Sequence, residues 1–167
     1  DYTIPAAATS ETGLLPSMRF MVAFNLAYRS RRIQFVIPHD GGTLCNLTCG
    51  HCYIESSPTN DRLEYLTAAE ARAYFDEIAR DGLPTEEIGF TGGEPFMNPD
   101  IVAMLDDALS RGFRALVLTN AMKPMRRHDK ALRALRDKYG ACLALRVSLD
   151  HYTRELHELE RGANSFA

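Results

Sequence analysis

The sequence predicts an α/β fold in which four parallel strands lie side by side and helices cover them. Short apolar runs rich in β-branched and aromatic residues alternate along the chain with segments whose apolar residues recur at helical spacing. Three helical segments end at Gly82, Gly112 and Gly140, so a strand–helix unit repeats at intervals of 30 and 28 residues. Because right-handed crossovers join consecutive parallel strands, their carboxyl ends meet at one edge of the sheet.

The composition bounds the class of protein. The chain has 167 residues, of which 46% are hydrophobic and 25% charged, so it is long enough for one domain with a core and is not a disordered chain. The net charge of -3 creates no global positive field, so nucleic acid is not an expected partner. No apolar run approaches the roughly 18–20 residues that span a bilayer, and clustered thiols suit a reducing compartment. We therefore expect a cytoplasmic protein without membrane contact.

Two segments are expected: an N-terminal extension over residues 1–32 and a core domain over residues 33–167. The core begins with a strand at Ile33–Ile37, a β-branched and aromatic run that Pro38 ends. Asp40-Gly41-Gly42 then turns the chain into a loop that lies beyond the carboxyl end of this strand.

The first three helices are expected from capping residues and apolar spacing. Thr67 and Glu70 form a capping box at the start of the first helix. Asn98 caps the second helix and Pro99 occupies its first position. The third helix is expected from about Arg126 to Tyr139, with its basic residues facing outward.

The later strands are short apolar runs, expected at 88–90, 113–119 and 142–150. The run at 113–119 lacks polar alternation, which is typical of a parallel strand covered on both faces. Cys142 is expected to be a small core residue of the fourth strand. A fourth helix should open at Thr153 with Leu156 and Leu159 facing inward and His157 exposed.

Three cysteines dominate the loop that follows the first strand. Cys45, Cys49 and Cys52 lie within eight residues, and an odd number of thiols cannot all pair as disulfides. A four-iron cluster held by three thiolates would keep one iron open for an outside ligand. Zinc needs a fourth ligand, and the nearby candidate is His51, whose position beside Cys52 is poor for chelating the same ion. An iron–sulfur cluster is favoured over zinc, and disulfide chemistry is the third alternative.

Polar residues follow the other strands at the same edge. In the stretch Gly92-Gly93-Glu94 the glycines let a ligand approach the backbone closely, and the carboxylate suits an ammonium group. An ordinary Gly-rich turn is the alternative. Asn120 ends the third strand. Ser148 and Asp150 share a face of the fourth strand and would be satisfied by a ribose diol, unless Asp150 caps the next helix and Ser148 is a satisfied core hydroxyl.

Together these features resemble the radical S-adenosylmethionine (radical SAM) enzymes over roughly residues 33–166. The three-Cys spacing, Thr91–Pro95 at the end of the second strand and Ser148-Leu149-Asp150 on the fourth strand match that family's motifs. The resemblance implies a partial, TIM-like barrel with about four of the family's usual six strand–helix units. It also implies that the SAM site is lined by Gly92, Gly93, Glu94, Asn120, Ser148 and Asp150.

The resemblance further implies a mechanism. Cys45, Cys49 and Cys52 would hold a 4Fe-4S cluster whose open iron binds the amino and carboxylate groups of SAM. One electron, from a reductase, flavodoxin or ferredoxin, would cleave SAM to methionine and a 5′-deoxyadenosyl radical that abstracts hydrogen from substrate. His51 would lie near the adenine, and Arg161 would meet the SAM carboxylate.

The substrate, a peptide or another small molecule, stays open in this interpretation. Two other function classes also stay open. One is an iron–sulfur electron carrier or redox sensor that never cleaves SAM. The other is a zinc-stabilised binding module.

Overall fold

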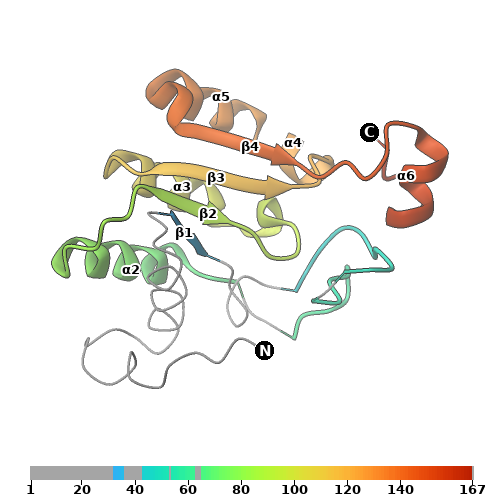
Figure 1. Ribbon diagram of the computed structural model, residues 1–167, viewed down its shortest axis with the longest axis horizontal. Coiled ribbons are helices and arrows are strands. Elements are labelled where there is room, and N and C mark those ends of the chain that lie inside the picture. The colour runs from blue at the N-terminus through green and yellow to red at the C-terminus, as the bar shows by residue number, and fades with distance from the viewer. Residues whose placement is uncertain (1–31, 36–42, 53, 63–64, 167) are drawn as a thin grey trace.

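The computed structural model describes residues 32–35, 43–52, 54–62 and 65–166 (Figure 1). These residues form a parallel sheet in the order β1-β2-β3-β4, so each strand lies beside the one before it in the chain. The strands are β1 (Arg32–Phe35), β2 (Glu87–Phe90), β3 (Arg114–Thr119) and β4 (Leu143–Val147). The predicted α/β class with a parallel sheet is confirmed. The division at residue 32 stays a prediction, because residues 1–31 and the turn at 40–42 lie outside the described residues.

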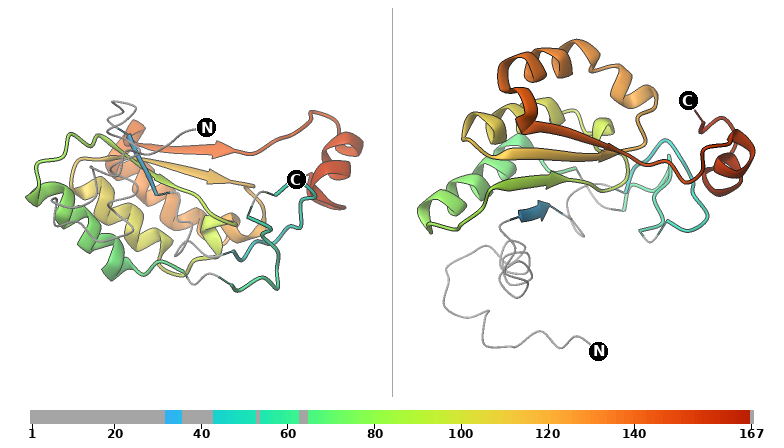
Figure 2. Two further views of the ribbon diagram at one scale, coloured as in Figure 1. Left: turned by 60° about the horizontal axis from the view of Figure 1, so that its bottom comes forward. Right: turned by 45° about the horizontal axis from the view of Figure 1, so that its top comes forward.

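Helices cover one face of the sheet (Figure 2). The described residues form the helices α2 (Ala68–Arg80), α3 (Ile101–Ser110), α4 (Lys123–Arg126), α5 (Asp129–Tyr139) and α6 (Arg154–Arg161), with 3-10 turns η2 (Pro95–Met97) and η3 (Gly140–Cys142). α2, α3 and α5 lie against the sheet, whereas α6 lies beyond the carboxyl ends of the strands. No helix in the described ranges is both long and apolar enough to cross a membrane.

The core fills the space between the sheet and these helices. Its fully buried members include Phe75, Ile88, Leu105 and Val117. On β3, buried residues alternate with Leu116 and Leu118, which are only half-buried. The expectation that this strand is covered on both faces is therefore wrong for the described part of the chain, because helices cover one face alone.

The first two helix starts are linked to each other. The predicted capping box of α2 is confirmed: the Glu70 backbone donates to Thr67 Oγ1 at 3.2 Å, and the Thr67 backbone donates to the Glu70 carboxylate at 2.9 Å. The second helix begins later than predicted, with Asp100 rather than Asn98 at its cap. The Asn98 side chain instead accepts from the Asp100 backbone at 2.8 Å, while the Asp100 carboxylate accepts from the Ala68 backbone at 2.9 Å. Asn98 thus holds the turn before α3, and Asp100 ties α3 to α2.

The helix predicted between β3 and β4 is present as α5, which ends at Tyr139 as predicted and begins at Asp129. A separate short helix, α4, precedes it, because His128 leaves the helical conformation (φ -102°, ψ 7°) between the two. Gly140 then closes α5, and the short turn η3 follows. Cys142 belongs to η3 and is exposed, so the prediction that it is a core residue of the strand is wrong.

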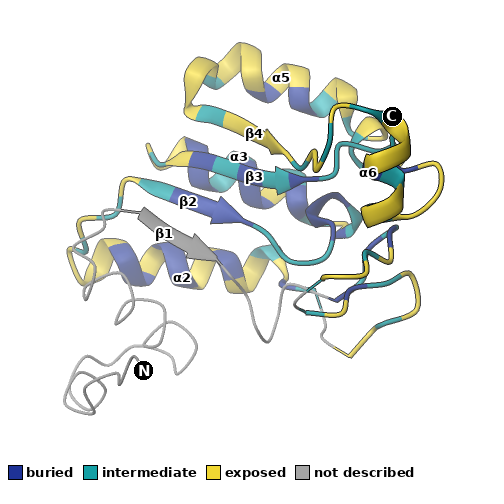
Figure 3. Ribbon diagram, turned by 45° about the vertical axis from the view of Figure 1, so that its right-hand side comes forward, coloured by how far each residue is buried: buried dark blue, intermediate teal, exposed yellow. Residues whose placement is uncertain are grey.

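The last strand and helix are barely covered (Figure 3). Val147 at the end of β4 is 54% exposed, and Leu156 and Leu159 of α6 are exposed rather than inward-facing as predicted. His157 takes the inward position, with only 3% of its surface exposed, so the expectation of an exposed histidine is also wrong. Its imidazole Nδ1 accepts from the Asp150 backbone at 3.3 Å, which explains why a polar residue turns inward there.

Candidate functional site

The cysteine loop, residues 43–52, lies at the carboxyl ends of the strands. The Cys45 backbone donates to the Ser57 carbonyl at 3.1 Å, and the Glu94 backbone donates to the Leu44 carbonyl at 3.1 Å. Gly93 is essential to this contact, because a Cβ at that position would lie 2.2 Å from the Leu44 carbonyl oxygen. The turn after β2 therefore holds the cysteine loop by close backbone approach.

The three thiols face one cavity of about 240 Å³, here called the cysteine cavity. Cys45 is buried, and Cys49 and Cys52 are half-buried. Backbone N–H groups approach two of the sulfurs at 3.4 Å, from Leu47 to Cys45 Sγ and from Ser56 to Cys52 Sγ. Beyond the cysteine loop itself, the lining includes Ser56, Thr91, Gly92, Gly93, Leu118, Thr119, Asn120, Ser148 and Arg161.

Burial governs the charge state of these thiols. It raises the pKa of Cys45 to about 11; the Leu47 N–H opposes this effect, and the negative charge on Glu94 and the other two cysteines adds to it. Burial also raises the pKa of Cys49, although the Arg161 guanidinium opposes the rise. Burial of these two thiols therefore favours their neutral form over the thiolate.

The donor set suits a polynuclear iron centre. Among the described residues, no group of three or more His, Cys, Asp or Glu side chains is arranged so that it could hold a single metal ion. Three soft thiol ligands facing one cavity, with N–H groups already directed at two sulfurs, are typical of an iron–sulfur centre. The residues present therefore fit a 4Fe-4S cluster.

Glu94 is a structural brace. It is 1% exposed, and its carboxylate accepts from Thr119 Oγ1 at 2.7 Å, the Asn120 N–H at 2.8 Å and the Phe96 N–H at 3.2 Å. Burial raises the pKa of Glu94, and these hydrogen bonds oppose the rise. The side chain therefore joins the end of β2 to the end of β3, and the stretch presents Gly92 and Gly93 to the cavity.

Asn120 connects this brace to the cysteine loop. Its side-chain amide donates to Asn46 Oδ1 at 2.9 Å and approaches Cys45 Sγ at 3.9 Å. Its side-chain oxygen accepts from the Met122 backbone at 3.1 Å. Asn120 therefore lies in contact with the cysteine loop, at the edge where the sequence predicts it.

The residues after β4 are arranged differently from the expectation. β4 ends at Val147, so Ser148 and Asp150 lie in the following loop rather than on a strand face. Ser148 lines the cysteine cavity. The Asp150 carboxylate is paired with the Arg161 guanidinium of α6, which holds the pKa of Asp150 below its ordinary value.

The end of α6 also contacts the cysteine loop. His51 Nδ1 lies 3.1 Å from the Glu160 carboxylate, and the Gly50 N–H donates to the Glu160 carbonyl at 3.4 Å. With the pairing of Arg161 and Asp150, these contacts form what we call the latch. The structure thus brings His51 and Arg161, both predicted from sequence, to the same side of the cysteine cavity.

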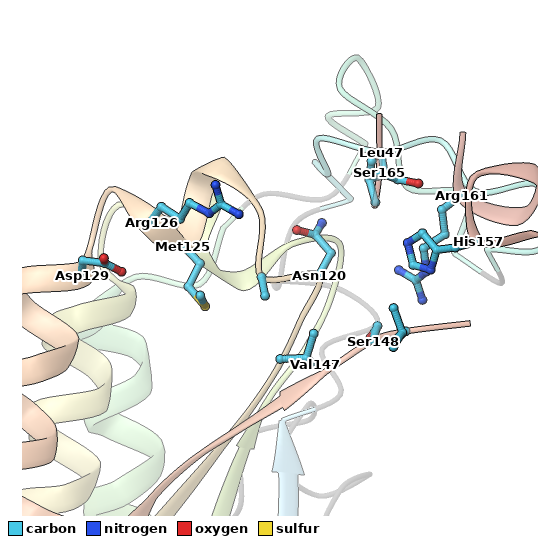
Figure 4. A pocket seen from close by; sticks show the side chains of 12 residues that line it. Leu47, Asn120, Met125, Arg126, Asp129, Val147, Ser148, His157, Arg161 and Ser165 are labelled. Carbon is cyan, nitrogen blue, oxygen red and sulfur yellow. The ribbon is translucent and has the colours of Figure 1, made fainter. Parts of the chain in front are cut away.

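A second cavity of about 410 Å³ adjoins the first (Figure 4). The two share Leu47, Asn120, Ser148 and Arg161. The second is further lined by Met125 from α4, His157 from α6 and Ser165. The polar edge of the sheet therefore continues past the cysteines toward the end of β4.

Three buried residues of this region were missed by sequence reasoning: Ser56, His157 and Ser165. Their burial depends on how distant parts of the chain pack together, which no local pattern reveals. One signal was available for Ser56, because it follows Cys52 by four residues and thus remains close to a predicted ligand.

The fold and the site define a class of protein: a parallel α/β domain with three thiols and a glycine turn at the carboxyl edge of its sheet. The chain belongs to the Radical SAM superfamily, whose model matches residues 41–167. A 4Fe-4S cluster and S-adenosylmethionine are the cofactors that this membership implies.

Relatives and solved structures agree with this assignment. The chain is 33% identical over 124 residues to the antilisterial bacteriocin subtilosin biosynthesis protein AlbA of Bacillus subtilis, covering 74% of this chain and 26% of that protein. It is 35% identical over 118 residues to the Fe-coproporphyrin III synthase of Methanosarcina barkeri, covering 71% and 27%. The crystal structure of Streptococcus suis SuiB bound to S-adenosylmethionine shares the fold, with a TM-score of 0.62 and 19% identity over 86% of this chain and 32% of that one. The chain thus spans about a quarter to a third of these proteins.

Proposed function

We propose that this chain forms the cluster- and SAM-binding part of an enzyme that uses SAM as a radical source. The observation that carries the proposal is the convergence of Cys45, Cys49 and Cys52 with the backbone of Gly92 and Gly93 on one cavity. Cys45, Cys49 and Cys52 would hold a 4Fe-4S cluster, and the bound cluster would supply the electron for reductive cleavage of SAM into methionine and a 5′-deoxyadenosyl radical that takes hydrogen from substrate. The protein contributes position and shelter from water.

Each residue has a proposed part in this site. The three cysteine thiolates would hold the cluster, and the carbonyl groups of the turn after β2 would accept from the SAM ammonium. The Arg161 guanidinium is the cation that the SAM carboxylate would meet. That contact competes with its pairing to Asp150, because the same guanidinium serves both carboxylates.

The remaining parts of SAM would lie along the same edge. Ser148, which lines both cavities, would meet the ribose, and Asp150 would join it. His51 would face the adenine, oriented by Glu160. Asn120 would complete the wall between the cysteines and the ribose.

The experiment is anaerobic reconstitution of the full chain with iron and sulfide, followed by dithionite and SAM. We expect about four iron atoms per chain for one 4Fe-4S cluster, and 5′-deoxyadenosine as product. Changing Cys45, Cys49 and Cys52 together to Ala should abolish both iron uptake and formation of 5′-deoxyadenosine. The control variant Cys142→Ala should leave the two quantities unchanged, because Cys142 is exposed on η3. Iron without 5′-deoxyadenosine would instead indicate an electron carrier or redox sensor, and zinc without iron would indicate a binding module.

We further propose a peptide substrate, a one-electron donor of the flavodoxin or ferredoxin type, and a cytoplasmic location. Support for the peptide comes from the similarity to a bacteriocin biosynthesis protein. The chain is also similar to an Fe-coproporphyrin III synthase, so the names of its relatives do not all indicate a peptide. Support for the location comes from the four free cysteines, which suit a reducing compartment. Transfer of deuterium from a deuterated candidate peptide into 5′-deoxyadenosine would test the substrate.

A further inference from the structure

Ser56 lines the cysteine cavity, and its buried hydroxyl has no hydrogen-bond partner among the described residues. The residue is 5% exposed. Burying a hydroxyl without a partner is unfavourable, because the group loses its hydrogen bonds to water. A partner supplied from within the cavity would remove that penalty.

The surroundings of Ser56 indicate what the partner is. The Ser56 backbone N–H donates to Cys52 Sγ at 3.4 Å, so this residue already contacts one predicted cluster ligand. The cavity that Ser56 lines is the one shared by the three cysteine thiols. An anionic sulfur, whether a thiolate or a sulfide of a cluster, is the acceptor that this cavity would offer to a serine hydroxyl.

We propose that Ser56 is a positioning residue that sets the reduction potential of the cluster, through a hydrogen bond from its hydroxyl to a cluster sulfur. This inference rests on the proposed function. Reduction adds one electron to the cluster and no proton, so negative charge on its sulfurs grows. A donor beside a sulfur therefore stabilises the reduced form more than the oxidised form, and removing the donor lowers the potential.

The test is a redox titration of the reconstituted full chain, followed by the electron paramagnetic resonance signal of the reduced cluster. For Ser56→Ala we expect about a fivefold fall in the ratio of reduced to oxidised cluster at a fixed potential. That fall corresponds to about 40 mV for a one-electron couple at 59 mV per tenfold change. Iron content per chain should stay that of the unaltered protein.

Ser165→Ala is the matched control. Ser165 is also buried with an unpartnered hydroxyl, but it lines the second cavity and not the cysteine cavity. Its variant should leave the potential unchanged. Ser56→Thr and Ser56→Val form a second pair of nearly equal shape, of which the first keeps the hydroxyl and should stay closer to the unaltered potential.

The outcomes separate the two proposals. If Ser56→Ala keeps its cluster and its potential matches that of Ser165→Ala, the role of Ser56 is refuted while the cluster stands. Equal potentials for the Thr and Val variants would refute it as well, even where the Ala variant fails to fold. An unaltered chain that takes up no iron would overturn both the function and this inference.

Discussion

The cysteine loop is held from two sides by different kinds of contact. On the β2–β3 side is the brace, in which the buried Glu94 carboxylate joins Thr119 and Asn120. On the α6 side is the latch, in which the Glu160 carboxylate contacts the His51 imidazole and the Arg161 guanidinium pairs with Asp150, at or near the surface. Because buried hydrogen bonds to a charge are costly to break and exposed ion pairs contribute little, the two sides differ in strength. The site thus has a rigid wall and an adjustable one.

The largest effect is expected from breaking the brace. Glu94→Ala would leave three buried or half-buried donors without an acceptor, on Thr119, Asn120 and Phe96. We expect a loss of about 3 kcal/mol or more in the free energy of unfolding, measured by chemical denaturation. A loss below about 1 kcal/mol would show that the carboxylate is not the brace.

Gly93→Ala should have the next largest effect. The added Cβ would lie 2.2 Å from the Leu44 carbonyl oxygen, so the cysteine loop would have to move away from β2. We expect a cost of about 1–3 kcal/mol and reduced iron uptake on anaerobic reconstitution. Gly50→Ala is the matched control in the same loop, because its Cβ would meet no atom within 4 Å. Equal iron uptake by the two variants would contradict this prediction.

Arg161→Ala tests the stronger part of the latch. Pairing with Arg161 lowers the pKa of Asp150, so its stabilisation is present above the ordinary aspartate pKa of about 3.9 and is lost as the pH falls through the lowered value. We expect the variant to lose about 1 kcal/mol at pH 7. The difference between variant and unaltered protein should shrink in denaturation curves recorded below about pH 4. A difference that grows toward acid pH would have the wrong sign.

Glu160→Ala should have the smallest effect. Both the His51 and Glu160 side chains are more than half exposed, so water and salt weaken their pairing. We expect a change in the free energy of unfolding of less than about 0.5 kcal/mol, checked by thermal and chemical denaturation. A cost similar to that of Glu94→Ala would remove the distinction between the rigid wall and the adjustable one.

Much of the fold could be predicted because its determinants are local. The capping box of α2, the apolar runs of the strands and the glycine that ends α5 all depend on near neighbours. The cysteine spacing likewise placed three thiols on one loop, and the rule for parallel strands placed that loop beside Gly92 and Gly93. The family membership agrees with that reasoning.

The rest depends on contacts between residues distant in sequence. Glu94 was expected to face a ligand, yet Thr119 and Asn120 turn its carboxylate inward. His157 was expected outside, and Leu156 and Leu159 inside, because apolar spacing alone cannot show that the Asp150 backbone would draw an imidazole toward the core. Polar partners thus overrode hydrophobic patterning at the end of the chain where the helices cover the sheet least.

The two adjoining cavities have a thermodynamic consequence. The cysteine cavity and the second cavity share four lining residues, Leu47, Asn120, Ser148 and Arg161. A molecule that binds in one cavity and shifts these side chains therefore changes the shape of the other cavity. Linkage then requires reciprocity: if occupancy of the first alters affinity in the second by some factor, the second alters the first by that same factor. Titrating one occupant at several concentrations of the other would reveal this cooperativity as a family of displaced isotherms.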